Sequence, residues 1–395
     1  MTQAHHDALL RLIEAGGSTA ARRTLLETHR DPLAALEAGP RAWREAGCDE
    51  TQARAIAGTA TPSAQRDLAR AWLAEPDHHL LGWHDPDYPA LLRRVANPPL
   101  ALFVAGDPGL LWHPAVAIVG SRSPSAGGRD NARDFARAIA ATGLGVTSGL
   151  AAGIDTAAHE AALSVDGITV AVLGSGIDIA YPRANASLYA RIAGRGAVVS
   201  EYPPGTQSQR GFFPARNRII AGLALGVLVV EAAERSGALI TARLASEAGR
   251  DVFAVPGSIH NPMARGCHRL IRDGAGLVEA ASEVTAAVAP LAAELGDALR
   301  QRLAAPSSGA GTAPGDAATS ETTDDPDYNR LWQALGHDPT GMDRLVERTG
   351  LTTAELSSML LLMELEGRVA VAHGRYARRR HDTANTAPSG AGRGK

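Results

Sequence analysis

Short apolar runs alternate with helical patterns through the central part of the chain. Strands buried on both faces read as nearly continuous apolar runs, whereas helices repeat their apolar positions about every 3.6 residues. The strand candidates are AVAIVG, GVTSGL, TVAVLG, AVVSEY, GVLVVEA and DVFAVPG, at residues 115–120, 145–150, 169–174, 197–202, 226–232 and 251–257. This alternation predicts an α/β fold with a Rossmann-like, doubly wound, mostly parallel sheet.

The segment after the first run has a regular helical stripe. Its apolar side chains fall at i, i+3, i+4, i+7 and i+8, namely Ala132, Phe135, Ala136, Ile139 and Ala140. Gly143 follows where a helix C-cap is expected. A connector precedes the first run at residues 84–108, and its prolines fix extended and turn geometry. We assign residues 77–295 to an extended Rossmann-like core.

Residues 1–76 read as short amphipathic helices with Gly, Ser or Asp at the joints, and we assign them to an N-terminal helical domain of the SAM or helix-hairpin-helix type. Gly16 and Gly17 lie between two of these helices. A helix-hairpin-helix turn at this point would hold a phosphate on backbone amides. A plain turn in a helical bundle explains the same two glycines.

The C-terminal part changes in composition. Residues 303–327 offer almost nothing to bury, which predicts a disordered linker, and residues 381–395 predict a disordered tail. Between them, residues 328–380 show three helical patterns and a candidate two-stranded wing, typical of a winged helix. Thr352 and Glu355 predict a capping box at the start of the third helix. This helix carries three glutamates and no arginine, which favours a protein partner over the DNA major groove.

Bulk properties exclude several classes of protein. The net charge of −3 gives no basic signal over the whole chain, so a nucleic-acid site has to be local. Cys48 and Cys267 are far apart, which argues against a zinc site or a disulfide framework. We see no signal peptide, and the apolar run 219–230 is shorter than the ~20 residues of a membrane span. We therefore expect a cytoplasmic protein with no membrane segment.

Glycines and small hydroxyl residues gather where the predicted strands end. Ligands of doubly wound folds bind at the carboxyl ends of the strands, where backbone N–H groups at helix N-termini attract anions. Three turns of this kind predict a phosphate-binding edge. The candidate contacts in them are Gly120, Ser121, Arg122, Ser148, Gly149, Gly153, Gly174 and Gly176.

A fourth element, GFFPARNRIIAG at residues 211–222, combines arginines with aromatic rings. Arg216 and Arg218 begin a helix, where the macrodipole disfavours cations, so we expect an anion beside them. Asn217 lies between the two arginines, and we include it with them among the candidate contact residues. Phe213 and its neighbour Phe212 offer flat surfaces on which bases can stack. Packing against the core explains one of the two rings equally well.

The sequence gives less support for a catalytic or metal site than for a phosphate-binding one. Asp155 and His159 are four residues apart on one helix, but no third ligand follows, and Asp155 is explained as well by helix capping. Glu201 and Glu231 end strands, where they serve either as acid/base groups or as caps and partners of Arg216 or Arg218. No Walker loop, nucleophile elbow or Cys–His signature is present. We expect no catalytic residue, metal or cofactor.

These motifs resemble the DNA-processing protein A family (DprA, also called Smf). The resemblance is continuous over residues 82–285, in the order YPALL, NPPLALFVAG, AIVGSR, VTSGLAAGIDTAAHEAAL, VAVLGSGIDIAYPRAN, VVSEYPPG, FPARNRIIAG, VVEAAERSGALITARLA, DVFAVPGS and GCHRLIRDGA. The flanking domains resemble those of the family more loosely. Departures from the family pattern are Ala152, where the family often has arginine, and Ala215 and Ala238, where basic and hydroxyl-bearing residues are frequent.

The resemblance implies a homodimer, formed through the Rossmann-like core, that binds single-stranded DNA. It further implies a non-enzymatic recombination mediator, which protects incoming DNA and helps to load the RecA recombinase during natural transformation. The DNA contacts that it implies are Arg122, Arg210, Phe213, Arg216 and Arg218.

Two other functions compete with this reading. A LOG-like nucleoside-monophosphate phosphoribohydrolase shares this style of core, but it carries a P-G-G-x-G-T turn and a catalytic glutamate. The corresponding turn here is RSGALIT, at residues 235–241. An NAD-linked dehydrogenase needs G-x-G-x-x-G and an acidic ribose ligand, and neither is present.

Overall fold

The computed structural model describes residues 2–58, 63–304, 330–332, 334–335, 340–352, 356, 359–360, 363, 369–372 and 375–378. The chain divides into two compact units, Met1–Ser307 and Ser308–Lys395. The expected linker falls outside the described residues except for 303 and 304, which end a helix, and the expected tail falls outside them entirely. The boundary at residue 76 stays a prediction.

The N-terminal segment is helical, as predicted. Its helices are α1 (Gln3–Glu14), α2 (Thr19–His29), α3 (Pro32–Glu37), α4 (Gly39–Glu45), α5 (Glu50–Ala57) and α6 (Ala64–Leu73). Asp49 and Gln52 form a capping box at the start of α5. Gly16 and Gly17 both have φ of +63°, and their carbonyls accept hydrogen bonds from Gln52 Nε2 and Arg22 Nη2, at 2.7 and 3.2 Å. Side chains of the bundle therefore close this turn.

A nine-stranded sheet with the order β1-β2-β6-β5-β4-β3-β7-β8-β9 forms the centre of the first unit. The strands are β1 (His78–Gly82), β2 (Ala101–Gly106), β3 (Ala115–Val119), β4 (Gly145–Ser148), β5 (Thr169–Val172), β6 (Ala197–Ser200), β7 (Gly226–Val229), β8 (Asp251–Ala254) and β9 (Gly276–Leu277). All six predicted strands are present, and the sheet is parallel from β6 to β9. The antiparallel strands β1 and β2 were not predicted: β2 lies within the proline-containing segment 84–108 that was assigned to a connector, and β1 lies just before that segment.

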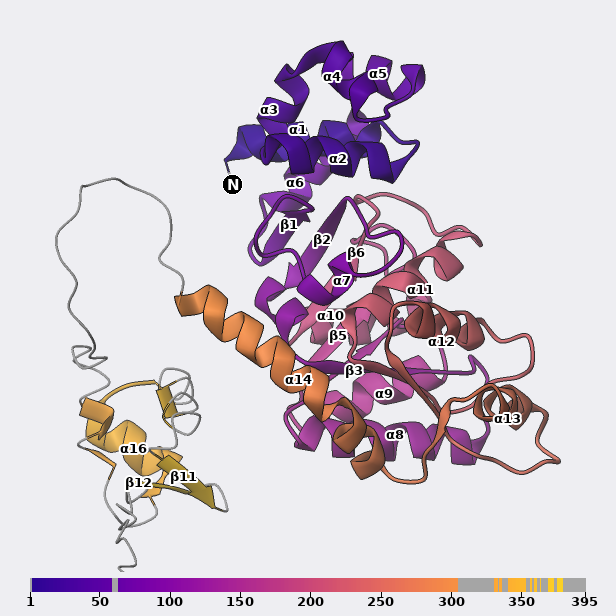
Figure 1. The fold of residues 1–395 in the computed structure, drawn as a ribbon. Coiled ribbons are helices and arrows are strands. Elements are labelled where there is room, and N and C mark those ends of the chain that lie inside the picture. The colour runs from indigo at the N-terminus through magenta and orange to yellow at the C-terminus, as the bar shows by residue number, and fades with distance from the viewer. Residues whose placement is uncertain are drawn as a thin grey trace, which may run out of the picture. The chain divides into compact units, whose positions relative to one another are not determined.

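Helices cover both faces of the sheet (Figure 1). They are α7 (Ala90–Arg93), α8 (Ala126–Ala141), α9 (Ile154–Leu163), α10 (Ala186–Ala193), α11 (Phe212–Leu223), α12 (Gly237–Glu247), α13 (Arg265–Arg272) and α14 (Ala281–Ala304). Alternate residues of β3 face opposite sides, since side chains of a strand point alternately to its two faces. Val116 and Ile118 join the apolar cluster of α8, α9 and α14, whereas Ala117 and Val119 join that of α11 and α12.

The strand order reverses between β3 and β7. From β3 the chain adds β4, β5 and β6 in one direction, and from β7 it adds β8 and β9 in the other. The two strands lie side by side and parallel, with Val119 opposite Val229. The connections that leave their carboxyl ends therefore diverge at this point. Doubly wound folds bind their ligands at such a switch point.

The second unit contains α16 (Met342–Thr349) and a small antiparallel sheet. Its strands β10 (Thr340–Gly341), β12 (Arg375–Arg378) and β11 (Val369–Ala372) pair in that order, as in a winged helix. Their apolar cluster contains Leu331, Leu335, Leu345, Leu356, Leu360, Met363 and Val369. Glu355 of the predicted capping box lies outside the described residues. No helix within the described ranges combines the length and apolar character needed to cross a bilayer.

Candidate nucleic-acid interface

Arg122 projects from the connection that follows β3. Its neighbour Ser121 is buried and donates its backbone N–H to the carbonyl of Glu231 at 2.7 Å, which ties this connection to the one after β7. The Ser121 hydroxyl accepts the N–H of Ser123 at 3.0 Å. Arg122 itself is exposed, and its guanidinium carbon lies 5.2 Å from the centre of the Phe213 ring. A fixed loop at the switch point thus presents a cation beside an aromatic face.

The two phenylalanines at the start of α11 have different surroundings. Phe213 lies 5.1 Å from the Tyr181 ring, tilted by 44°, whereas Phe212 stacks on Tyr202 at 4.1 Å and 19°. Both phenylalanine rings are half-buried. A Cβ at Gly174 would lie 2.9 Å from the Phe213 ring, so this glycine makes room for Phe213. Phe213 is therefore the ring of this pair that adjoins Arg122.

Arg216 lies inside the protein, with 4% of its surface exposed. Its Nη1 donates to the carbonyls of Gly149, at 2.7 Å, and of Val172, and its Nε donates to Asn217 Oδ1 at 3.0 Å. Burial lowers its pKa to about 10, the charge of Asp155 opposes that shift, and the charge of Arg122 adds to it. Arg216 therefore links the ends of β4 and β5 instead of pointing into solvent.

A cavity of about 410 Å³ opens beside Arg216 at the switch point. Arg122 and Asn217 also line it, together with Ser236 and Thr241 from the start of α12. Asn217 is 8% exposed, and its Nδ2 donates to the carbonyl of Gly237 at 3.4 Å. Arg122 and the adjacent pair Arg216 and Asn217, which were predicted from two separate motifs, thus meet around one cavity.

Arg218 lies apart from that cavity and already has an anionic partner. Both carboxylate oxygens of Glu201 accept from its guanidinium, at 2.7 and 2.6 Å, and the Asn97 carbonyl accepts from its Nε at 2.6 Å. Burial lowers the pKa of Arg218, but the hydrogen bonds and charge of Glu201 outweigh burial and raise it overall. The expected pairing of Glu201 with one of the two arginines is thus present. Arg210 is exposed, and within the described ranges it makes no ion pair.

Internal carboxylates occupy two of the anion-attracting turns. Asp155 Oδ2 accepts the backbone N–H groups of Gly149 and Ala151 at 3.1 and 3.3 Å, at the start of α9. Glu231 accepts the N–H of Ser125 and the Nδ2 of Asn261, both at 2.8 Å, at the start of α8. Burial raises the pKa of Asp155, whereas Arg216 and the two N–H groups oppose that shift. The helix termini that were expected to hold external phosphate are already neutralised from within.

The remaining predicted turn residues shape the backbone. Gly153 has φ of +88°, and a Cβ there would lie 2.3 Å from the carbonyl oxygen of Ser121. Gly176 donates its N–H to the carbonyl of Thr206 at 2.7 Å. A Cβ at Gly120 would meet Ile154 at 2.7 Å, and one at Gly149 would meet the Arg216 guanidinium at 2.5 Å. The Ser148 hydroxyl donates to the carbonyl of Ile118 at 2.6 Å.

His159, the other half of the Asp155–His159 pair, is fully buried. Its Nδ1 lies 2.7 Å from the hydroxyl of Thr169, and burial lowers its pKa to about 3. Asp155 and His159 therefore have separate partners. In the described part of the chain, no three His, Cys, Asp or Glu side chains are grouped as metal ligands would be.

A Rossmann-like core with cationic and aromatic groups at its switch point, followed by a winged helix, defines the class of protein. The family model described as DNA recombination-mediator protein A matches residues 79–289, and the one described as DprA winged helix domain matches residues 315–375. The chain belongs to this family of DNA recombination mediators, the DprA/Smf family.

Known relatives and a solved structure agree with this assignment. Protein Smf of Escherichia coli is 40% identical over 320 residues, which cover 81% of this chain and 82% of that protein. The DNA processing protein DprA of Streptococcus pneumoniae is 49% identical over 202 residues, covering 51% and 71% of the two chains. The X-ray structure of DprA from S. pneumoniae matches with a TM-score of 0.63 and 38% identity, over 70% of this chain and 95% of that one. The family resemblance and fold class predicted from sequence are confirmed.

Proposed function

We propose that this recombination mediator binds single-stranded DNA at the carboxyl edge of its sheet, protects incoming DNA and helps to load RecA during natural transformation. The observation that carries the proposal is the contact of the exposed Arg122 with the Phe213 ring, 5.2 Å apart at the switch point. A cation beside a flat ring suits a phosphate followed by an unpaired base. Bases in a duplex are stacked on one another, so the ring favours a single strand.

The internal carboxylates support a polymer ligand over a free nucleotide. Rossmann-type enzymes hold a nucleotide phosphate at a helix N-terminus, and here Glu231 and Asp155 fill the starts of α8 and α9. A phosphate placed there would meet a negative charge. We therefore locate the phosphate contacts on the surface, at Arg122 and Arg210, with Arg216 as a buried cation beneath them.

The same geometry disfavours the phosphoribohydrolase alternative. Glu231 is 4% exposed, and its two carboxylate oxygens accept from Ser125 and Asn261. A catalytic carboxylate has to reach the substrate, and this one is committed to holding two loops together. We propose that the chain is not an enzyme.

Direct binding measurements test the proposal. Oligonucleotide titrations should show that the wild type prefers single-stranded over double-stranded DNA, and Arg122→Ala should weaken binding about tenfold. Unchanged affinity in Arg122→Ala, or equal affinity for duplex, would remove the proposed interface. Release of free base from AMP by the wild type, abolished in Glu231→Gln, would establish the alternative. RecA loading is tested by whether the protein shortens the lag of RecA assembly on single-stranded DNA covered by a single-strand-binding protein.

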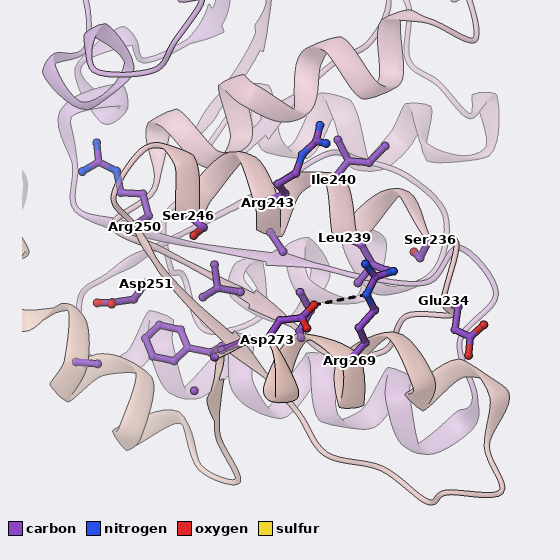
Figure 2. Close-up of a pocket in the computed structure, with 18 of the residues that line it drawn as sticks. Glu234, Ser236, Leu239, Ile240, Arg243, Ser246, Arg250, Asp251, Arg269 and Asp273 are labelled. Carbon is purple, nitrogen blue, oxygen red and sulfur yellow. Dashed lines mark ion pairs between the residues drawn. The ribbon is translucent and has the colours of Figure 1, made fainter.

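We also propose that two copies associate through the β9 edge of the core. A cavity of about 740 Å³ lies between α12 and α13, and Ser236 borders both this cavity and the smaller one at the switch point. Figure 2 shows that residues of both signs surround it, including Arg243, Arg269 and Asp273. A two-fold contact brings one surface against itself, so mixed charge makes such a surface self-complementary.

The free sheet edge adds to this argument. β9 is the last strand of the sheet, and Leu277 on it is 50% exposed. Light scattering should give a dimer for the wild type and a monomer for Leu277→Asp. The matched control is Val165→Asp, since Val165 is 42% exposed on the connection between α9 and β5. A dimer that survives Leu277→Asp would exclude this face.

Both cysteines are buried and free, which supports the reducing cytoplasm as the location.

A further inference from the structure

Tyr181 is a large exposed ring beside the proposed interface. It is 44% exposed, and the other large apolar side chains exposed to this degree in the described residues are aliphatic: Leu68, Val165, Ile259 and Leu277. A tyrosine ring left partly in solvent forgoes part of the stabilisation that burial of a large apolar side chain supplies. Its place on the connection after β5 puts it at the carboxyl edge of the sheet, as with Arg122 after β3.

The connection that carries Tyr181 is braced on both sides. Before it, the Ser175 hydroxyl donates to the carbonyl of Ile179 at 2.7 Å. After it, the Asn185 side chain donates to the carbonyl of Leu150 at 2.8 Å, and its backbone N–H donates to the carbonyl of Pro182 at 2.9 Å. The backbone that carries the ring is therefore fixed before any ligand arrives, which lowers the entropy lost on binding.

Arg122 and Tyr181 both adjoin the Phe213 ring. The guanidinium of Arg122 is 5.2 Å from the Phe213 ring, and that ring is 5.1 Å from the Tyr181 ring. A base inserted between two parallel rings needs them about 7 Å apart, twice the ordinary contact distance. The two rings are 5.1 Å apart and tilted by 44°, which is too close for this, so a base has to stack on each ring separately. The arrangement suits successive nucleotides better than one clamped base.

We propose that Tyr181 is a second base-stacking residue for single-stranded DNA, serving the nucleotide next to the one that stacks on Phe213. This inference rests on the proposed single-strand binding. It assigns to the Tyr181 ring, not to its hydroxyl, the recognition of a further base, and it gives the bound strand a path from the end of β3 towards the end of β5. Stacking on a ring is tolerant of sequence, so this contact adds affinity without base preference.

Abasic scanning tests the assignment. A single abasic nucleotide is moved along an oligothymidine, and affinities are measured for wild type, Tyr181→Ala and Phe213→Ala. Tyr181→Ala should lower affinity for intact DNA about tenfold. At one abasic position the wild type should lose the same factor and Tyr181→Ala should lose nothing further. In Phe213→Ala, the silent abasic position, meaning the one that causes no further loss of affinity, should be the immediate neighbour of the position that causes no further loss in Tyr181→Ala.

Tyr181→Phe is the matched control, because it keeps the ring and removes the hydroxyl. Wild-type affinity in this variant supports the ring, whereas a loss as large as that of Tyr181→Ala would overturn the proposal in favour of a hydroxyl–phosphate contact. Full affinity in Tyr181→Ala, or no silent abasic position, would also overturn it while leaving the proposed function intact. Absence of wild-type binding to any single strand would instead defeat the proposed function itself. Urea unfolding of each variant confirms that the proteins are folded.

Discussion

Arg218 and Glu201 form a bidentate ion pair in which both carboxylate oxygens accept from the guanidinium, at 2.6 and 2.7 Å. The two side chains are only 15% and 17% exposed. This pair joins α11 to the end of β6, and the Nε of Arg218 extends the link to the carbonyl of Asn97. The guanidinium of Arg218 is thus engaged by the protein itself. In this it differs from Arg122, which is exposed and lies four positions before the start of α8.

Arg218 should therefore matter more for stability than for charge-driven DNA binding. Arg218→Gln should lower the free energy of unfolding by about 2 kcal/mol, since it removes hydrogen bonds between charged groups that are mostly buried. Glu201→Gln should lose a similar amount. In urea titrations the double variant should lose less than the sum of the single variants, because the second change removes a partner that is already unpaired. Strictly additive losses would show that the pair contributes nothing as a pair.

The salt dependence of binding should distinguish exposed from buried arginines. Each phosphate contact in single-stranded DNA contributes about 0.7 to the slope of log affinity against log salt concentration. Arg122→Ala and Arg210→Ala should each reduce the slope by about this amount, with unfolding unchanged. Arg137→Ala, which removes an exposed arginine paired with Asp134 on α8, should leave the slope as it is. An unaltered slope in both test variants would place the phosphate contacts elsewhere.

Gly174 should control the position of the Phe213 ring. A Cβ at Gly174 would lie 2.9 Å from that ring, closer than side chains tolerate, so Gly174→Ala should displace Phe213 and weaken single-strand binding severalfold. Gly127→Ala is the matched control, because a Cβ there would meet nothing within 4 Å. Equal affinities of the two variants, measured by fluorescence anisotropy, would mean that the ring position does not matter.

His159 should make the folded state less stable in acid. Burial lowers its pKa from 6.5 to about 3, so between these values the unfolded chain binds a proton that the folded chain refuses. Stability therefore falls as the pH falls below 6.5, by on the order of 1 kcal/mol per pH unit. Urea unfolding between pH 6.5 and 5, above the range of ordinary carboxylates, should show a steeper decline for wild type than for His159→Gln. Parallel curves would contradict this assignment.

Local patterns were enough to predict six of the nine strands of the sheet. The strands β3 to β7 are buried on both faces, so their runs of apolar residues are visible without knowledge of their neighbours. In β1 the run is interrupted by His78 and His79, whereas β2 is apolar and buried throughout but follows prolines and was therefore assigned to a connector. Their pairing is decided by contacts with β6 and the N-terminal helices, which lie far away in the sequence.

The candidate site was only partly visible in the sequence. The motifs indicated which residues gather at the carboxyl edge, because chain order and strand direction fix that edge. They did not distinguish an arginine that faces solvent from one that caps strand ends: Arg216 and Arg218 are two positions apart, yet the first binds backbone carbonyls and the second binds Glu201. Tyr181, which we propose as a further contact, was not among the contacts predicted from the sequence.

The sequence by itself determined the family, the alternation of central strands and helices and the edge at which a ligand is expected, since these depend on local periodicity and on motifs in a fixed order. Only the tertiary structure decided which charges are free. Asp155 and Glu231 reach backbone amides of neighbouring connections, and Glu201 reaches Arg218, through contacts between segments that meet only in the folded sheet. Whether a charged group serves the fold or a ligand depends on its distance from partners and on its burial, and neither is encoded in its position along the chain.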